Sequence, residues 1–338
     1  MLRSRKRAIG IALFLILPLA LAACSSTGGK KAAQAAQSGG TAAAAGHANT
    51  QQYTIAMITH AAPGDTFWDI IRHGALAAAA KDNITLKYSS DPDPTKQAAL
   101  IQDAINSKVA GIAVTDPNPA AICPTIQKAV QAGIPVVMFN AGVSNWQQCG
   151  GMSYFGQDES IAGLAAGKRL AQAGAKHVLC VLQATGQVQL EARCAGVAKG
   201  LGSEGTMTKV YVNGTDNSAM LSSMTAKLTQ DKTIDAVITL GAPVALVAIQ
   251  SINSAHSTAK LYTFDTNAAL IAKIKSGAVQ WAVDQQPYLQ GYLSVDSLWL
   301  YLTNGNIIGG GVTVLTGPAF IDASNVAKVS QYALAGNR

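Results

Sequence analysis

The sequence is poor in charged and aromatic side chains, and it lacks the short motifs of several enzyme classes. Charged residues make up 13% of the 338 residues, and aromatic residues make up 6%. No G-x-S-x-G, H-E-x-x-H or P-loop motif occurs, and the five histidines are scattered without the spacing of metal ligands. A G-x-G-x-x-G pattern at residues 200–205 follows a helical pattern and precedes a strand pattern, whereas a phosphate-binding turn needs the reverse order. The sequence therefore indicates a protein that is not an enzyme and has no cofactor or metal.

Basic residues are also sparse once the N-terminus is set aside. The formal net charge is +7, but four basic residues lie within the first 23 residues, which leaves +3 for the remainder. No lysine- or arginine-rich run of the kind that binds nucleic acid remains in residues 24–338. We therefore expect no nucleic-acid partner.

The N-terminus has the pattern of an export signal. A basic head at residues 3–7 is followed by an apolar stretch that Pro18 interrupts. This stretch is shorter than the ~20 residues of a membrane span, and it ends in LAAC at residues 21–24, which resembles a bacterial lipobox. In that family of signals the peptide is cut before the cysteine, whose sulfur then carries a diacylglycerol. We therefore expect a signal peptide at residues 1–23 and lipidation of Cys24.

The next segment, residues 24–51, consists almost entirely of Ser, Thr, Gly, Ala, Gln and Lys. Such a segment cannot bury enough apolar surface to offset the entropy lost on ordering, so we expect a flexible tether. Several acyl chains on one cysteine hold a protein firmly at a membrane, whereas a single chain binds only marginally. The protein is therefore expected to be exported and lipid-anchored at the outer face of the cell membrane, in a periplasm or at a cell surface.

Beyond Cys24 the chain has four more cysteines, at positions 123, 149, 180 and 194. An even number in an exported chain allows two disulfides, with three possible connectivities, and buried free thiols are the alternative. We expect pairing between sequence neighbours, which gives Cys123–Cys149 and Cys180–Cys194.

From Tyr53 onward, short apolar or β-branched runs alternate with alanine-rich runs of helical pattern. YTIAMI precedes FWDIIRHGALAAAAK, ITLKYS precedes PTKQAALIQDAINS, and the rhythm continues to VQWAVDQ and PYLQGYLSVDSLWLYLTNG. This alternation predicts parallel strands joined by crossover helices. The number of repeats is about twice that of one domain of ~100–150 residues. We therefore predict an α/β fold of two doubly wound, Rossmann-like lobes.

The two lobes are expected to exchange segments of chain. The N-terminal lobe would comprise residues 52–156 and 286–313, and the C-terminal lobe would comprise residues 157–285 and 314–338. In this arrangement the helical run after Gln285 returns to the N-terminal lobe, and the VTVLTGPAFID segment closes the C-terminal lobe.

Seven motifs in a fixed order carry a family resemblance. They are THAAPGDTFW, IAVTDP, VVMFNAG, FGQDESIAG, LEARCAG, YTFD and VDQQPYLQGY. Over Tyr53–Asp322 the chain resembles the ribose/galactose-type (type I) substrate-binding proteins of bacterial ABC importers. The resemblance implies two lobes on a multi-strand hinge that close on a sugar. It also implies a closed form that docks on a membrane permease, and we expect a monomer.

The resemblance further implies a set of ligand-binding residues, because each motif lies at the carboxyl end of a predicted strand, where such sheets bind ligands. In the family, aromatic faces hold the sugar, and carboxylates, amides and an arginine hydrogen-bond its hydroxyl groups. The matching residues are Asp65, Phe67, Trp68, Asp116, Asn140, Arg193, Asp265 and Gln285. Further candidates for ligand or hinge contact are His60, Gln157 and Asp158.

Local sequence offers other roles for some of these residues. Phe67 and Trp68 are also suited to packing a helix on the sheet, and Asp116 stands before a proline, as at the start of a turn. Asp265 is suited to capping a helix N-terminus. Arg193 lies in an otherwise small and apolar helix start, where an arginine without a partner would be unfavourable, and this favours a role in the site.

The chain departs from the ribose-type pattern at two strand ends. Asn140-Ala141 stands where those proteins have Asp-Arg, and Gly241-Ala242-Pro243 stands where they have Asn-Asp. In addition, no aromatic residue lies near Thr215, where the family often has one. We therefore expect a less polar pocket that takes a pentose, a hexose, a polyol or another small hydroxylated ligand, with Trp68 as the residue that stacks on it.

These observations predict a lipoprotein that captures a sugar or polyol and delivers it to ABC transporter permease subunits. A receptor with the same lobes that presents its ligand to a membrane chemosensor is the alternative. A sugar-responsive repressor shares the lobes too, but it would begin with a helix-turn-helix in place of an export signal.

Overall fold

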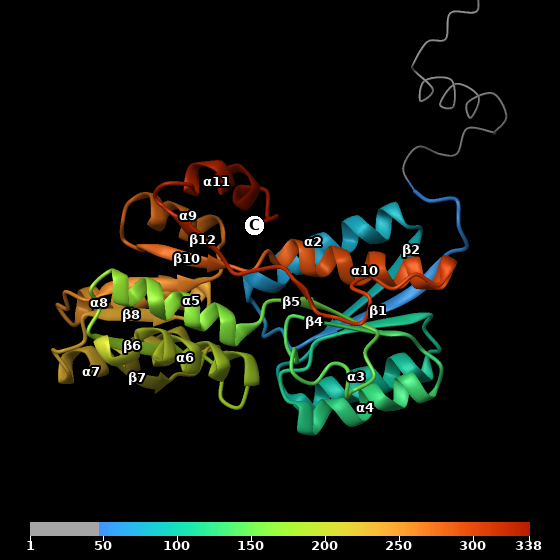
Figure 1. The fold of residues 1–338 in the computed structure, drawn as a ribbon, viewed down its shortest axis with the longest axis horizontal. Coiled ribbons are helices and arrows are strands. Elements are labelled where there is room, and N and C mark those ends of the chain that lie inside the picture. Colours follow the sequence, from blue (N-terminus) through green and yellow to red (C-terminus); the bar gives the residue numbers. More distant parts are fainter. Residues whose placement is uncertain (1–46) are drawn as a thin grey trace, which may run out of the picture. The chain divides into compact units, whose positions relative to one another are not determined.

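The computed structural model describes residues 47–338. The signal peptide expected at residues 1–23, the lipidation of Cys24 and most of the tether expected at residues 24–51 lie outside the described residues. The described chain forms two α/β lobes, each built on a six-stranded sheet with helices packed against it (Figure 1). This is the fold class that the alternating pattern predicts. Within this described part, no helix is both long enough and apolar enough to cross a membrane.

The first sheet is parallel throughout, with the strand order β11-β5-β4-β3-β1-β2. Its strands are β1 (Tyr53–Thr59), β2 (Ile84–Ser90), β3 (Gly111–Val114), β4 (Val136–Phe139), β5 (Ser153–Gly156) and β11 (Val314–Leu315). The helices of this lobe are α2 (Thr66–Lys81), α3 (Pro94–Asn106), α4 (Pro119–Gln131) and α10 (Pro287–Asn304). The late helix α10 packs against the early helix α2 (Figure 1).

The side chains of β1 explain why this sheet is parallel and fully covered. Ile55 and Met57 belong to one hydrophobic cluster, whereas Ala56 and Ile58 belong to another. Because successive side chains of a strand point to opposite faces, the sheet is buried on both sides, as parallel sheets usually are.

The second sheet has the strand order β12-β10-β9-β8-β6-β7, with only β12 antiparallel to its neighbour. Its strands are β6 (His177–Leu182), β7 (Thr206–Tyr211), β8 (Ala236–Thr239), β9 (Lys260–Phe264), β10 (Trp281–Asp284) and β12 (Ala319–Asp322). Its helices are α5 (Glu159–Gln172), α6 (Val188–Leu201), α7 (Asn217–Gln230), α8 (Ala242–Ser254), α9 (Ala268–Lys275) and α11 (Val326–Leu334), and a short 3₁₀ turn covers Gly202–Glu204.

The chain passes between the two sheets after β5, after β10 and after β11. The last of these crossings differs from the expected boundary at residue 314. Val314 and Leu315 pair in parallel with Phe155 and Gly156, so the first half of the VTVLTGPAFID segment extends the first sheet. Only its second half, β12, joins the second sheet.

Two disulfides are present, Cys123–Cys149 and Cys180–Cys194, and both pairings were predicted from the sequence. The first joins α4 to the loop that follows β4, and the second joins β6 to α6. The second disulfide therefore fixes the position of α6 on the sheet of its own lobe.

Candidate ligand-binding site

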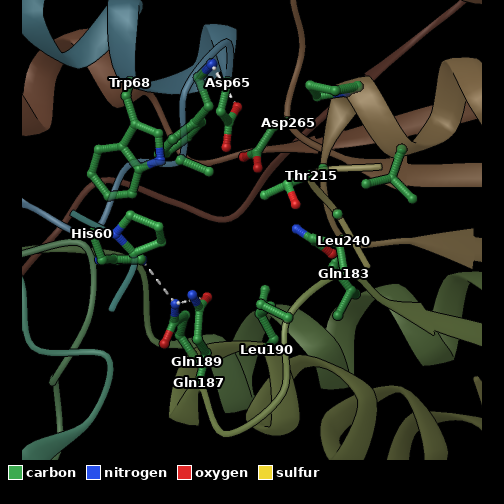
Figure 2. A pocket seen from close by; sticks show the side chains of 18 of the residues that line it. His60, Asp65, Trp68, Gln183, Gln187, Gln189, Leu190, Thr215, Leu240 and Asp265 are labelled. Atoms are coloured by element: carbon green, nitrogen blue, oxygen red, sulfur yellow. Dashed lines mark hydrogen bonds between the residues drawn. The ribbon is translucent and has the colours of Figure 1, made fainter. Parts of the chain in front are cut away.

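A cavity of about 380 Å³ lies at the carboxyl ends of the parallel strands and is lined by residues of both lobes. The first lobe contributes residues of the loop after β1 and the start of α2, and the second contributes loops after β6, β7, β8 and β9 (Figure 2). This is the edge of an α/β sheet at which ligands bind, and the volume lies in the range of ~300–1,000 Å³ that is usual for small-molecule sites.

Most of the residues predicted from the sequence line this cavity. They are Asp65, Phe67, Trp68, Asn140, Arg193, Asp265, Gln285 and the additional candidate His60. Asp116, Gln157 and Asp158 are not among its lining residues. Residues that are 220 positions apart in the sequence therefore meet at one place, as the order of the motifs implied.

An aromatic wall belongs to the first lobe. Asp65 caps α2 by accepting a hydrogen bond from the backbone N–H of Phe67, which places Phe67 and Trp68 in the first turn of the helix. The Trp68 ring lies 4.6 Å from that of His60 and 5.3 Å from that of Phe67, in both cases edge to face. Both Phe67 and Trp68 also belong to the hydrophobic core of the lobe, so the packing role and the cavity role coexist.

Both ring nitrogens of His60 are engaged by the protein. Nε2 lies 3.1 Å from the side-chain amide nitrogen of Gln189, and Nδ1 lies 2.8 Å from the hydroxyl oxygen of Thr115. Because an amide nitrogen can only donate, Nε2 accepts and the proton is on Nδ1. Burial, with a smaller contribution from the charge of Arg193, lowers the pKa of His60 to about 3, so the ring is neutral. His60 therefore offers the cavity an uncharged ring and no free hydrogen-bonding nitrogen.

Arg193 has a buried partner that the sequence did not reveal. Its Nε and Nη2 donate to the two carboxylate oxygens of Glu159 at 2.6 and 2.9 Å, and its Nη1 donates to the carbonyl oxygen of Leu240 at 2.9 Å. The guanidinium also lies 4.8 Å from the centre of the Phe264 ring. Burial alone would lower the pKa of Arg193, but the charge and hydrogen bonds of Glu159 keep it above its usual value.

The carboxyl groups of Asp65 and Asp265 come from different lobes and point toward one another at one edge of the cavity (Figure 2). Burial raises the pKa of Asp65, and the N–H of Phe67 partly offsets this effect. Burial also raises the pKa of Asp265 to about 7, against the opposing charge of Arg193, whose Nη1 lies 3.7 Å from Oδ2. Asp265 does not cap the helix that follows it, because Asn267 is the N-cap of α9.

A chain of amide groups connects the lobes where the strands cross. Asn140 Nδ2 donates to the side-chain oxygens of Gln285 and Gln290 at 3.2 and 3.1 Å, and Gln285 Nε2 donates to Asp265 at 2.7 Å. The amide of Gln285 is thus occupied on both sides, and it holds Asp265 in place.

The second lobe presents an aliphatic and amide surface to the cavity, without an aromatic side chain among its described lining residues. Leu190, Leu240 and Thr215 lie opposite Trp68 and His60 (Figure 2). Gln183 and Gln189 also line this side, and each has a buried side-chain oxygen without a hydrogen-bond partner. Gln183 directly follows β6, so its position at a strand end was the signal by which it could have been found, whereas Gln189 lies in the first turn of α6.

The three candidates outside the cavity have other partners. Asp158 caps α5 through the N–H groups of Ser160 and Ile161, and Gln157 Nε2 donates to Glu159 at 2.8 Å. Asp116 is fully buried, and its Oδ2 lies 3.7 Å from the sulfur of Cys149. Burial raises the pKa of Asp116 to about 7, with the N–H of Asn118 opposing the shift. A disulfide sulfur has no proton to donate, so this contact favours the protonated carboxyl as donor.

Comparisons with known proteins agree with this architecture. A family model described as periplasmic binding protein domain matches residues 55–306. A carbohydrate transporter from Acidothermus cellulolyticus 11B, solved in complex with myo-inositol, is 61% identical, covers 85% of this chain and 100% of its own, and has a TM-score of 0.84. A solute-binding protein from Burkholderia graminis C4D1M in complex with D-arabinose has the same fold at 22% identity, with a TM-score of 0.73, and the match covers 81% and 96% of the two chains.

Among curated proteins, the xylose/arabinose-binding protein XylF of Sulfolobus acidocaldarius is 27% identical over 254 residues, which are 70% of this chain. The chain spans 63% of the length of that relative. Since the family model extends from β1 to the loop after α10 and so includes elements of both lobes, the chain belongs to the periplasmic binding protein domain family, of the type I that its sequence motifs resemble.

Proposed function

We propose that the protein is an extracytoplasmic binding protein that captures a sugar or related small polyol in the cavity between its lobes and delivers it to an ABC import permease. The observation that carries this proposal is the cavity itself, in which an aromatic wall of one lobe faces carboxyl and amide groups of the other. Ring hydroxyls both donate and accept hydrogen bonds, and ring C–H groups pack on aromatic faces, so a sugar or cyclic polyol matches both surfaces.

The ligand class is supported by the carbohydrate transporter from Acidothermus cellulolyticus, which is 61% identical and was solved with myo-inositol. At that identity over its entire length, most of the cavity is expected to be shared. A cyclic polyol therefore stands beside pentoses and hexoses as a candidate, and myo-inositol is the first compound to test.

Each residue of the site then has a distinct role. The face of Trp68 stacks on the ring of the ligand, with Phe67 behind it, and the carboxyl groups of Asp65 and Asp265 accept from ligand hydroxyls. Asn140 offers its side-chain oxygen, because its nitrogen is engaged by Gln285 and Gln290. Arg193 contributes at most the edge of Nη1.

Direct hydrogen bonds between the lobes support a binding step that brings the lobes together. Besides Gln189 and His60, the backbone N–H of Val188 donates to the carbonyl oxygen of Pro117 at 3.1 Å. The side-chain nitrogen of Asn267 lies 3.2 Å from the hydroxyl oxygen of Thr66. A ligand held by both lobes increases the population of molecules in which these contacts form, and the permease binds this closed form. Capture and delivery of the ligand require no chemical step.

Lipidation of Cys24 would hold a monomer at the outer face of the membrane, close to the permease. Metabolic labelling with a radioactive or clickable fatty acid tests this part: the wild type should be labelled and Cys24→Ser should not. Equal labelling of the two would remove the lipid anchor from the account.

Thermal-shift screening against neutral pentoses, hexoses and cyclic polyols, including myo-inositol, tests the binding function. A ligand that binds the folded state alone raises the melting temperature in proportion to the logarithm of its concentration. We expect at least one such compound to do so. Absence of any shift across the panel, at millimolar concentrations, would contradict the proposed function.

A further inference from the structure

Every nitrogen of the Arg193 guanidinium already has a partner in the protein. Nε and Nη2 are bound by Glu159, and Nη1 donates to the carbonyl oxygen of Leu240. Glu159 is 2% exposed and does not line the cavity, so it neutralises the arginine from behind the cavity wall. The bidentate geometry is the one that a carboxylate ligand would otherwise occupy.

The packing of two helices fixes this pair. Glu159 is the first residue of α5, and Arg193 lies in the middle of α6. The helices approach so closely that a Cβ atom on Gly163 would lie 2.3 Å from the carbonyl oxygen of Arg193, which no side chain permits. Gln157 donates to the same Glu159 oxygen that binds Nε, which restricts the carboxylate further.

The charges that face the cavity are therefore unbalanced. Among its described lining residues, Arg193 is the one permanent cation, and Asp65 and Asp265 are carboxyl groups. His60 is neutral, since both of its nitrogens are engaged and its pKa is low. Nη1 of Arg193 also lies 3.7 Å from Oδ2 of Asp265, so the single cation is shared between Glu159 and Asp265, and with Asp65 the carboxyl groups at this wall outnumber it.

We propose that Glu159 is a positioning residue that makes the site selective for uncharged hydroxylated ligands against their anionic counterparts, sugar acids and sugar phosphates. This inference rests on the proposed binding of a sugar or polyol. A hydroxyl group can donate to Asp65 and Asp265, whereas a carboxylate or phosphate meets two acceptors and an arginine whose charge is already shared by Glu159 and Asp265. Rejection through an unpaired like charge is a common basis of binding specificity.

The same geometry predicts how the selectivity can be changed. Glu159→Gln keeps the shape and the buried hydrogen-bonding group but removes the charge that neutralises Arg193. The guanidinium then keeps only the partial compensation by Asp265, 3.7 Å from Nη1, and a guanidinium is well suited to bind a carboxylate or phosphate. The variant should lose selectivity by gaining affinity for the anion.

The experiment is a set of calorimetric titrations of the full-length protein at about pH 8, where Asp265 is ionised. The probes are D-glucose with D-glucuronate and its uncharged amide, D-galactose with D-galacturonate and its amide, and myo-inositol with myo-inositol 1-phosphate. The amides separate the effect of charge from that of shape. For a neutral compound that binds, we expect the wild type to prefer it to its anion by at least about 100-fold, since like charges in an interface are strongly unfavourable.

Glu159→Gln should reduce this preference at least about tenfold, while the amides remain equal to the neutral sugars. Glu191→Gln is the matched control, because Glu191 lies on α6 but pairs with Lys209 at the surface. This variant should prefer the neutral compound to its anion as strongly as the wild type does. Glu159→Gln/Arg193→Gln, which leaves the cavity wall without a charged pair, should regain the preference.

A wild type that binds an acid within about threefold of its neutral partner would overturn the proposal, whether or not the variants fold. A folded Glu159→Gln protein with unchanged preference would overturn it as well. A wild type that binds none of the neutral probes would contradict the proposed function itself.

Discussion

The side-chain amide nitrogen of Gln189 lies 3.1 Å from Nε2 of His60, and this buried hydrogen bond joins the two lobes beside the cavity. Gln189 lies in the first turn of α6 and His60 directly after β1, so neither residue can keep this partner if the lobes separate. The contact therefore belongs to the arrangement in which both lobes face one ligand.

Gln189→Leu should weaken ligand binding roughly tenfold, because a buried hydrogen bond between the lobes is lost. The acceptor nitrogen Nε2 of His60 is then left without a donor, which should reduce the binding free energy by ~1–3 kcal/mol. Calorimetry measures the change in Kd. Thr66→Val, which removes the exposed contact with Asn267, is the control and should change Kd about twofold or less. In a His60→Phe background, Gln189→Leu should have little further effect, and an undiminished effect there would show that Gln189 acts through another contact.

Trp68→Leu should raise Kd at least about tenfold, since buried tryptophans commonly dominate a binding interface. Leucine keeps apolar bulk in the core of the lobe but provides no flat face for a sugar ring. Trp299→Leu is the comparison, because Trp299 is partly buried on α10, donates to Thr50 and does not line the cavity. Equal Kd values for the two variants would remove Trp68 from the site.

Asp116→Asn should change how stability depends on pH. The pKa of Asp116 is raised to about 7 in the folded protein, whereas an unfolded aspartate titrates near ~3.9. Between these values the folded state binds the additional proton, so this group contributes stability below about pH 4 that is lost as pH rises through about 7.

The asparagine variant should therefore be more stable than the wild type at about pH 8, by at least ~1 kcal/mol, and the difference should shrink toward acidic pH. Urea unfolding at several pH values measures it. Asp103→Asn, on an exposed part of α3, should leave the profile as it is. If Asp116→Asn does not make stability less dependent on pH than in the wild type, the raised pKa of the buried Asp116 carboxyl is contradicted.

Replacing Cys180 and Cys194 by serine should lower both stability and ligand affinity. The disulfide spans 14 residues and should contribute about 3 kcal/mol to the free energy of unfolding. It also holds α6, which carries Arg193 and Gln189, on its sheet. The corresponding variant of Cys123 and Cys149 should lose comparable stability with a smaller change in Kd, because α4 contributes no lining residue. Calorimetry and urea unfolding of both double variants test this, and the reverse order of Kd values would contradict it.

Local sequence patterns were sufficient for the architecture. Alternating strand and helix signals depend on neighbouring residues alone, and the strand ends they define carried Asp65, Asn140, Asp265 and Gln285 to one cavity. The sheet assignment near the end of the chain could not be predicted. Val314 and Leu315 form a two-residue strand, which is too short to have a periodicity that would assign it to either sheet.

Side-chain partners over long sequence separations were not predictable. Glu159 precedes Arg193 by 34 residues, and only the close packing of α5 on α6 brings them together, so the sequence did not reveal that the arginine of the cavity wall also pairs with a buried glutamate. Asp116 follows a strand as Asn140 and Asp265 do, but its carboxyl lies beside the sulfur of Cys149 and not at the cavity. A strand end specifies which edge of the sheet a residue occupies and leaves the direction of its side chain open.

The most direct measurement is a calorimetric titration of the wild-type protein and of Trp68→Leu with myo-inositol and the neutral sugars of the panel. We predict one saturable site per chain for at least one of these compounds, and a Kd at least about tenfold higher in Trp68→Leu. Absence of binding to the wild type, or equal binding to both proteins, would contradict a ligand site between Trp68 and the second lobe.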